Sequence, residues 1–335
     1  MKNQTTLNTF LAQHLQGEHA TALNAMLGDI VNAVKKIAVA IDAGALNGNM
    51  GSLDATNVQG ETQKALDVIC NDIFLDAVQQ SGFITGMVSE ENAEPIKVAE
   101  QYQQNGQYLL CFDPLDGSSN VNVNISVGTI FSVLKSAQQQ PTLHDFLQAG
   151  NQQICAGYAL YGTSTMLVFT VGNGVHGFTL DTKTGVFYLT HLHMQILPDT
   201  QEFAVNMSNY RFWQAPVQRY IDECLQGEEA DREKDFNMRW VASMVAEVHR
   251  ILVRGGVFMY PADSKSPHGK LRIMYEANPM SFIVEQAGGA ATTGFMRILD
   301  LIPTSIHQRV PVILGSKNEV DRIATYHQKK TKKKS

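Results

Sequence analysis

The hydrophobic positions in the first quarter of the chain predict two amphipathic helices joined by a loop. Within 23–43, apolar residues recur at steps of three and four positions, which is the repeat of a helix with one buried face. A similar stripe covers roughly 61–80, with Lys64 and Asp67 on its polar face. The Gly- and Asn-rich segment 44–60 has no period. It is therefore predicted to be a mobile loop, either a plain linker or a lid beside an active site.

Farther along, short apolar runs bounded by Gly, Ser and Thr predict many strands. The clearest is the apolar run 108–112, which ends at Asp113. Further strands are predicted at 83–88, 125–134, 154–160, 165–171, 257–260 and 312–314, with a hairpin at 175–189 and helices near 212–225, 238–252 and 280–286. Because strands and helices mix without strict alternation, we predict a layered α/β fold with large mixed sheets. Segment 195–201 is predicted to separate two domains, 1–197 and 198–335.

The composition places the chain among globular proteins and excludes several functions. A length of 335 residues exceeds one typical compact domain, and 44% hydrophobic residues suffice for a large core. The net charge of −6 argues against general nucleic-acid binding, and four cysteines without a Cys-x-x-Cys pair argue against a zinc site or disulfide framework. Without an apolar run of about 18 residues or a signal-peptide pattern, we expect a cytoplasmic protein with no membrane partner. The lysines in 329–335 fit a solvated tail, with polyanion binding as the alternative.

The strongest candidate site is the run Asp113-Pro114-Leu115-Asp116-Gly117-Ser118-Ser119. Asp113 follows the apolar strand, at the end where α/β sheets commonly bind ligands. Pro114 is expected to stop the strand ladder, and the turn after it should bring Asp116 to the same side. Gly117 permits a tight bend, after which hydroxyls and free backbone N–H groups favour a phosphate. The alternative is a strand followed by a common Asp-Gly turn.

The neighbouring carboxylates Glu90 and Glu91 form a second candidate. Adjacent carboxylates repel one another unless a cation or solvent separates them. Alone they fit a solvated loop, but together with the aspartates they supply hard oxygen ligands for Mg²⁺ or Mn²⁺. Two or more such ions can hold both the attacking and the leaving oxygen of an in-line displacement. The pair His191 and His193 lacks a third ligand nearby in the sequence and is interpreted as surface or core packing.

The Asp113–Ser118 run resembles the signature of the lithium-sensitive, metal-dependent phosphatases. Longer matches resemble the class I fructose-1,6-bisphosphatases, which implies a sugar-phosphatase fold, an α-β-α-β-α sandwich. These matches cover most of the chain: Ser89-Glu90-Glu91, Asp113–Asn120, Ser126–Phe131, Gly157–Gly162, Tyr260-Pro261, Ser266-Pro267, Gly269–Arg272, Tyr275-Glu276, Asn278–Met280 and Ile306–Arg309.

The resemblance implies a role for each matching residue. Glu91 is implied as a metal-linked acid that, with Asp67, activates the attacking water. The implied metal ligands, for two or more Mg²⁺ per subunit, are Glu90, Glu91, Asp113, the Leu115 carbonyl, Asp116 and Glu276. The implied cradle of the phosphate to be cleaved is Asp116, Gly117, Ser118 and Ser119. The donors implied for the remote phosphate are Asn206, Tyr210, Arg239, Tyr260 and Lys270, with Arg239 coming from a neighbouring subunit of a homotetramer.

Basic residues in the C-terminal part also indicate an anion-binding site, independently of the resemblance. Arg239, Lys265, Lys270 and Arg272 form a cluster of cations in the sequence of an acidic protein. Each is also compatible with an ordinary surface charge. A cationic cluster would hold an unreacting phosphate, and that binding energy can fix the geometry at the reacting end.

The sequence departs from the family pattern at several places, among them Trp240, Met207-Ser208, Asn122 and the AMP site. Trp240 stands where a phosphate-binding tyrosine is usual; its indole N–H can still donate, but the ring is bulkier. The usual AMP-binding pattern near the N-terminus is replaced by 20–24, and Gln107 and Lys135 stand where a lysine and an arginine are usual. We therefore expect weak or absent inhibition by AMP.

The leading hypothesis is hydrolysis of fructose 1,6-bisphosphate to fructose 6-phosphate and phosphate, in gluconeogenesis. A phosphatase that also accepts sedoheptulose 1,7-bisphosphate is the first alternative, because both substrates present two phosphates. A catalytically silent sugar-phosphate sensor is the second, although no implied metal ligand has been lost. A nucleotide-binding dehydrogenase is disfavoured, because the glycines at 288–294 lack the required spacing and preceding strand.

Overall fold

Two mixed β-sheets form the framework of the computed structural model, which describes residues 4–44, 52–56, 62–103 and 105–331. The larger sheet has eight strands in the order β10 (Val186–His191), β9 (His176–Asp181), β8 (Thr165–Thr170), β7 (Cys155–Tyr161), β6 (Val127–Lys135), β5 (Tyr108–Asp116), β3 (Ile84–Ser89) and β4 (Ile96–Lys97). Its neighbouring strands are antiparallel apart from β3 and β5, which are parallel.

The smaller sheet has five strands in the order β12 (Asn237–Met238), β11 (Glu202–Ala204), β13 (Val257–Tyr260), β17 (Val312–Gly315) and β15 (Ala290–Thr292). β11 is parallel to both of its neighbours, and the other pairs are antiparallel. Two separate antiparallel pairs complete the strands: β1 (Ser52–Thr56) with β2 (Thr62–Lys64), and β14 (Leu271–Arg272) with β16 (Arg309–Val310).

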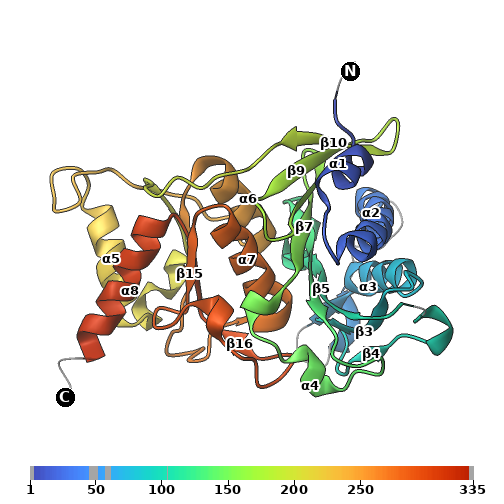
Figure 1. Cartoon of the computed structure of the whole chain (residues 1–335). Coiled ribbons are helices and arrows are strands. Elements are labelled where there is room, and N and C mark those ends of the chain that lie inside the picture. The colour runs from blue at the N-terminus through green and yellow to red at the C-terminus, as the bar shows by residue number, and fades with distance from the viewer. Residues whose placement is uncertain (1–3, 45–51, 57–61, 104, 332–335) are drawn as a thin grey trace.

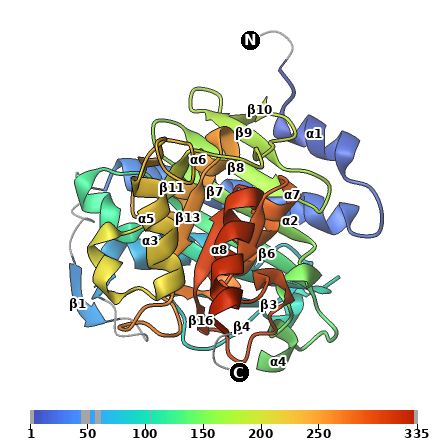
Figure 2. The same ribbon diagram turned by 90° about the vertical axis from the view of Figure 1, so that its left-hand side faces the viewer.

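Helices and sheets alternate in five layers (Figure 1). The outer face of the larger sheet carries α1 (Leu7–His14), α2 (Ala20–Asp42) and α3 (Ala65–Val78), while α6 (Met244–Arg254) and α7 (Asn278–Gln286) fill the space between the sheets. α5 (Ala215–Leu225) and α8 (Lys317–Thr331) cover the outer face of the smaller sheet and lie side by side in Figure 2. The predicted α-β-α-β-α arrangement with mixed sheets is confirmed.

The shorter helical segments connect these layers. They are α4 (Leu143–Phe146), the 3-10 turns Glu100–Tyr102, Ser118–Val123, Gly150–Gln152, Met207–Phe212 and Ile298–Asp300, and the wide turn Ile273–Ala277 that leads directly into α7. Apolar clusters fill the spaces between the layers. In the cluster between the larger sheet and helices α1 to α3, Phe74 of α3 stacks on Phe112 of β5 with ring centroids 4.4 Å apart. The strand that carries the candidate site is therefore buried on both faces.

Strand β5 corrects the prediction that Pro114 stops the ladder. The strand pairs with β6 on both sides of the proline, but its register changes from Asp113 opposite Ile130 to Asp116 opposite Gly128. Three steps on β5 thus span two on β6, which is a bulge, and a bulge tolerates proline because its residues leave the regular ladder. The Thr129 hydroxyl donates to the Pro114 carbonyl at 2.8 Å and satisfies it there.

The helix predicted at 238–252 begins later than the apolar pattern indicates. Residues 237–238 form β12 instead, and helix α6 starts at Met244. The backbone N–H of Arg239 donates to the Phe203 carbonyl at 2.7 Å, so this part of the chain is paired with β11. Apolar periodicity could not separate an edge strand from the helix that follows it.

The C-terminal helix α8 was not predicted, because its apolar stripe is short and its remaining residues are polar. Val320, Ile323 and Tyr326 are buried against the cluster beneath α5. The predicted solvated tail at 329–335 overlaps the end of this helix, and 332–335 lie outside the described residues. Most of the predicted loop 44–60 also lies outside them; the part that is described includes β1.

Candidate active site

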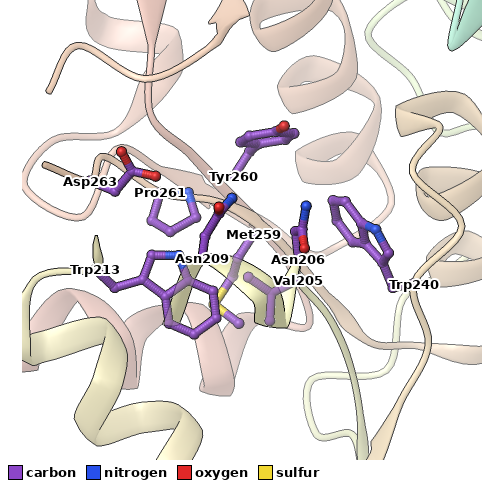
Figure 3. Close-up of a pocket in the computed structure, with 9 residues that line it drawn as sticks. All are labelled: Val205, Asn206, Asn209, Trp213, Trp240, Met259, Tyr260, Pro261 and Asp263. Atoms are coloured by element: carbon purple, nitrogen blue, oxygen red, sulfur yellow. The ribbon is translucent and has the colours of Figure 1, made fainter. Parts of the chain in front are cut away.

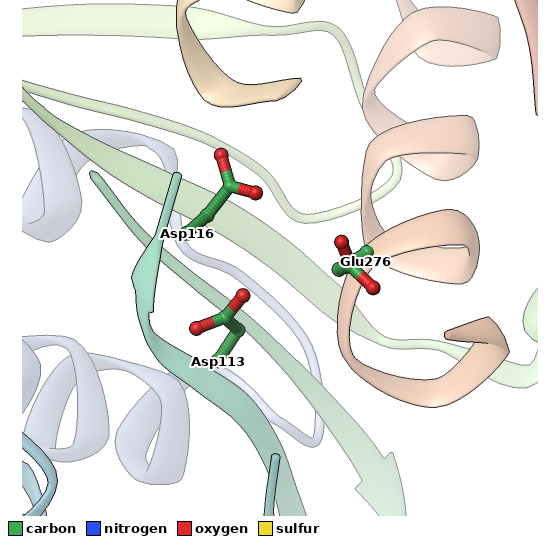
Figure 4. Close-up of side chains that lie close together, drawn as sticks. All are labelled: Asp113, Asp116 and Glu276. Carbon is green, nitrogen blue, oxygen red and sulfur yellow. The ribbon is translucent and has the colours of Figure 1, made fainter. Parts of the chain in front are cut away.

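The bulge in β5 places two buried carboxylates beside a third from the opposite layer. Asp113 and Asp116 project from the strand, and Glu276 comes from the turn that precedes α7 (Figure 4). One oxygen of each carboxylate lies within 4.8 Å of the others. Backbone N–H groups fix their orientation: Leu115 donates to Asp113 at 2.9 Å, and Val245 donates to Asp116 at 2.9 Å.

Burial and mutual repulsion disfavour the charged forms of these carboxylates. Desolvation is the first cause that raises the pKa of Asp113 and Glu276 well above the usual range, and the charge of Glu90 adds to it. The pKa of Asp116 is raised to about 7, mainly by desolvation and against the opposing N–H of Val245. Such a buried acidic cluster needs a compensating cation. The oxygen donors therefore fit a hard divalent ion.

Arg272 supplies part of the positive charge that the acidic cluster needs. Its guanidinium lies 2.6 Å from the Glu90 carboxylate, and the two side chains are only 5% and 12% exposed. Its backbone N–H also donates to Glu276 at 2.6 Å. Arg272 thus belongs to the acidic end of the site, where the sequence did not place it.

The carboxylates open into a cavity of about 290 Å³ whose other wall is the turn after β5. Gly117 has φ +75°, and a β-carbon there would lie 2.9 Å from the Ser243 hydroxyl, so this position needs glycine. The cavity brings most of the predicted residues together. Its lining is Asp67, Glu90, Glu91, Asp113, Leu115, Asp116, Gly117, Ser118, Ser119, Tyr260, Lys270, Leu271, Arg272 and Glu276.

Asp67 lies at the start of α3, where local contacts link it to the turn that contains Ser118. It accepts from the backbone N–H of Lys64 at 2.9 Å, and the Lys64 ammonium donates to the Ser118 carbonyl at 2.6 Å. Burial raises the pKa of Asp67, while the Lys64 N–H and the Ser118 hydroxyl oppose that shift. Sequence reasoning placed Lys64 on a solvated helix face and so missed this bridge.

A second, small pocket of about 10 Å³ adjoins the cavity through Tyr260, which lines both. Asn206 and Trp240 also line it (Figure 3). The Trp240 ring is parallel to the Phe258 ring, with centroids 6.0 Å apart. It is tilted by 63° against the Tyr260 ring, whose centroid lies 6.1 Å away. Two of the predicted donors for the remote phosphate, Asn206 and Tyr260, thus line one pocket together with Trp240.

Two other predicted donors lie elsewhere in this chain. The Tyr210 hydroxyl donates to Asp222 at 2.7 Å, and Arg239 lies 3.6 Å from Glu202 with about half of its side chain exposed. Lys265 does not line the cavity either; its ammonium lies 3.9 Å from the centre of the Phe212 ring. Among the four cations singled out in the sequence, Lys270 and Arg272 line the cavity.

The histidines singled out in the sequence lie away from this cavity. The His193 ring packs against His176 with centroids 4.5 Å apart, and His191 lies 6.4 Å from His249. Within the described parts of the chain, the one group of three or more metal-ligating side chains is Asp113, Asp116 and Glu276. No helix among the described residues has the length and apolar character to cross a membrane.

Comparison with known proteins identifies a phosphoric monoester hydrolase. The family model described as "Fructose-1-6-bisphosphatase, N-terminal domain" matches residues 5–192, and the model of the C-terminal domain of the same enzyme matches residues 196–328. The chain therefore belongs to the fructose-1,6-bisphosphatase family.

Individual relatives agree over nearly the full length. A class 1 fructose-1,6-bisphosphatase of Halorhodospira halophila is 57% identical over 333 residues, which cover 97% of this chain and 98% of that protein. The crystal structure of Leishmania major fructose-1,6-bisphosphatase in its holo form is 37% identical, with a TM-score of 0.91 over 97% of this chain and 99% of that one. The apo form is 35% identical, with a TM-score of 0.86 over 97% and 100%.

Proposed function

We propose that the protein hydrolyses the 1-phosphate of fructose 1,6-bisphosphate and releases fructose 6-phosphate and phosphate, a step of gluconeogenesis. The observation that carries this proposal is the cavity in which three buried carboxylates face the Gly117–Ser119 turn. A cation-binding end and a phosphate-binding turn thus share one opening. Lys270 and Tyr260 line the same cavity and lead toward the pocket of Asn206 and Trp240.

The acidic end is proposed to hold two or more Mg²⁺ ions, with Mn²⁺ as a substitute. The ligands would be Glu90, Glu91, Asp113, the carbonyl of Leu115, Asp116 and Glu276. Bound there, divalent cations would neutralise the carboxylates, polarise the phosphoryl oxygens and lower the pKa of water. The raised pKa of Asp116 supports this assignment, because burial, its main cause, makes the charged carboxylate costly unless a cation lies beside it.

The remaining side chains have proposed roles in positioning and proton transfer. Asp67 and Glu91 would orient the attacking water and accept its proton; the raised pKa of Asp67 brings that carboxylate closer to the neutral range in which a general base works best. Ser118 and Ser119 would hold the reacting phosphate together with the Gly117 backbone. Transfer to water would then proceed in line, with binding at the other end keeping the geometry.

The remote phosphate is proposed to bind between Lys270, Tyr260 and Asn206, near Trp240, with Tyr210 also assigned to this set. Arg239 would come from a neighbouring subunit of a homotetramer. The exposure of Arg239 and of the adjacent apolar Met238, both 47%, supports a role at a subunit contact. We also propose a division into domains 1–197 and 198–335, and a reducing compartment such as the cytoplasm, since all four cysteines are free.

The test is phosphate release by the purified protein with Mg²⁺ from three substrates offered in parallel. Fructose 1,6-bisphosphate should be hydrolysed fastest, and inositol monophosphate, which lacks a second phosphate, should be a poor substrate. Comparable turnover of sedoheptulose 1,7-bisphosphate would establish the dual-specificity alternative. Failure to hydrolyse either bisphosphate, together with tight binding of both, would instead favour the sugar-phosphate sensor.

A further inference from the structure

The segment between β12 and α6, residues 239–243, connects the two proposed phosphate sites. Arg239 and Trp240 are at its beginning, and Trp240 lines the remote-phosphate pocket of the same chain. At its other end, the Asn120 side chain donates to the Ala242 carbonyl at 2.8 Å, and Ser243 packs against Gly117. The geometry of this segment therefore bears on both ends of the substrate.

The segment has no regular secondary structure of its own and includes a strained residue. Ala242 has φ +62°, in the left-handed region that residues with a β-carbon seldom adopt. Such a conformation persists only where surrounding contacts determine it. The contacts that hold the segment are therefore part of the site.

Glu247, in the first turn of α6, is fully buried and provides one of the contacts that hold the segment. One carboxylate oxygen accepts the backbone N–H of Val241 at 2.6 Å. The other receives Arg250, whose two nitrogens lie at 3.1 and 3.3 Å. The Glu247 side chain is 0% exposed, so its charge depends on these partners.

The same network continues to Arg239 through a second buried carboxylate. Arg250 donates its remaining nitrogen to Glu202 at 2.6 Å. The other oxygen of Glu202 lies 3.6 Å from Arg239 and 2.6 Å from Arg254. The chain of contacts thus leaves the segment at Val241, passes through Glu247, Arg250 and Glu202, and returns at Arg239.

This arrangement fixes the direction of the Arg239 guanidinium and leaves part of it exposed to solvent. Its side chain is 47% exposed, against 15% for Arg250 and 11% for Glu202. A carboxylate on one side of a guanidinium fixes its direction while other N–H groups stay open to a phosphate. The buried part of the network provides rigidity, and the exposed arginine provides the contact.

We propose that Glu247 is a positioning residue for the remote phosphate, acting through the 239–243 segment and Arg239 without touching substrate. This inference rests on the proposed function, in which Arg239 of one subunit binds the remote phosphate held by its neighbour. Loss of Glu247 should therefore weaken recognition of the remote phosphate. Recognition of the reacting phosphate should be spared, because the hydrogen bond from the Asn120 side chain to the Ala242 carbonyl still holds the end of the segment beside Gly117.

The test compares kcat and KM for fructose 1,6-bisphosphate and for fructose 1-phosphate, which lacks the remote phosphate. In Glu247→Ala we expect kcat/KM for the bisphosphate to fall at least tenfold, chiefly through KM, with the monophosphate changed less than twofold. Glu247→Gln keeps the length and one acceptor oxygen for Val241 and should recover part of the loss. Glu285→Ala is the matched control, because it breaks the ion pair between Glu285 on α7 and Arg297, outside the network.

A double variant shows whether the effect passes through Arg239. Once Arg239→Ala is present, adding Glu247→Ala should lower kcat/KM for the bisphosphate by less than twofold more. The proposal would be contradicted if the losses of kcat/KM from the two single variants multiply in the double variant. It would also be contradicted if Glu247→Ala lowers kcat/KM equally for the bisphosphate and the monophosphate. The Gln variant gives the same comparison if the alanine variant fails to fold.

A readout independent of activity separates this inference from the proposed function. In a Trp213→Phe background, Trp240 is the remaining tryptophan, and acrylamide quenching of its fluorescence reports how firmly the segment is held. Glu247→Ala should raise the quenching constant at least twofold, while Glu285→Ala should not change it. Greater quenching in a protein that hydrolyses neither bisphosphate would refute the proposed function alone. Unchanged quenching in an active enzyme would refute the role of Glu247.

Discussion

Replacing Asp116 with asparagine should stabilise the metal-free protein and abolish its activity. The pKa of Asp116 is raised from its usual 3.8 to about 7 by burial. Because the folded state then binds the proton more tightly than the unfolded state, the stability that Asp116 contributes is complete below its unfolded pKa and is lost as pH rises through about 7. At about 1.4 kcal/mol for each tenfold change, ionising this carboxyl costs the metal-free fold about 4 kcal/mol at pH 8.

Urea unfolding in the presence of a chelator measures this cost directly. At pH 8, Asp116→Asn should raise the free energy of unfolding by up to about 4 kcal/mol, whereas at pH 4 the two proteins should differ by less than about 1 kcal/mol. Added Mg²⁺ should raise the melting temperature of the wild type more than that of the variant, and phosphate release by the variant should be lost. A variant that is less stable than the wild type at pH 8 in chelator would refute the reasoning.

Other contacts give further predictions. Glu319 forms a buried ion pair with Arg232 at 2.6 Å. Glu319→Gln should therefore lower the free energy of unfolding in urea by about 3 kcal/mol, whereas Asp116→Asn raises it. A loss smaller than that of an exposed ion pair would contradict this. The usual AMP-binding pattern is replaced at 20–24 and at Gln107 and Lys135, so AMP at micromolar concentration should leave activity unchanged in a titration; half-inhibition in that range would overturn the expectation. Trp240→Tyr should lower KM for the bisphosphate about three- to tenfold, because a hydroxyl donor to a charged phosphate is worth roughly 1 kcal/mol; an unchanged KM would show that the indole already serves.

The sequence was most informative where a local pattern coincides with local structure. The strand before Asp113, the glycine at 117 and the stripes of α2 and α3 depend on residues close together in the chain, and the structure contains each of them. Pro114 was misjudged because a bulge is a property of two paired strands. The pattern on one strand does not reveal the register of its neighbour.

The parts of the site that depend on long-range packing were less accessible. Glu276 joins Asp113 and Asp116 from another layer, and only a family resemblance placed it there. Arg272 was grouped with the phosphate-binding cations, yet it pairs with Glu90 at 2.6 Å. Nothing in the local sequence signals such contacts, because tertiary packing alone decides which cation meets which carboxylate.

The most direct measurement of the central claim is the identity of the products formed from fructose 1,6-bisphosphate by the purified protein with Mg²⁺. We predict one equivalent each of phosphate and fructose 6-phosphate, no reaction in chelator, and no reaction with Asp116→Asn. Fructose 1-phosphate as the product, or equal turnover with and without the divalent ion, would contradict it.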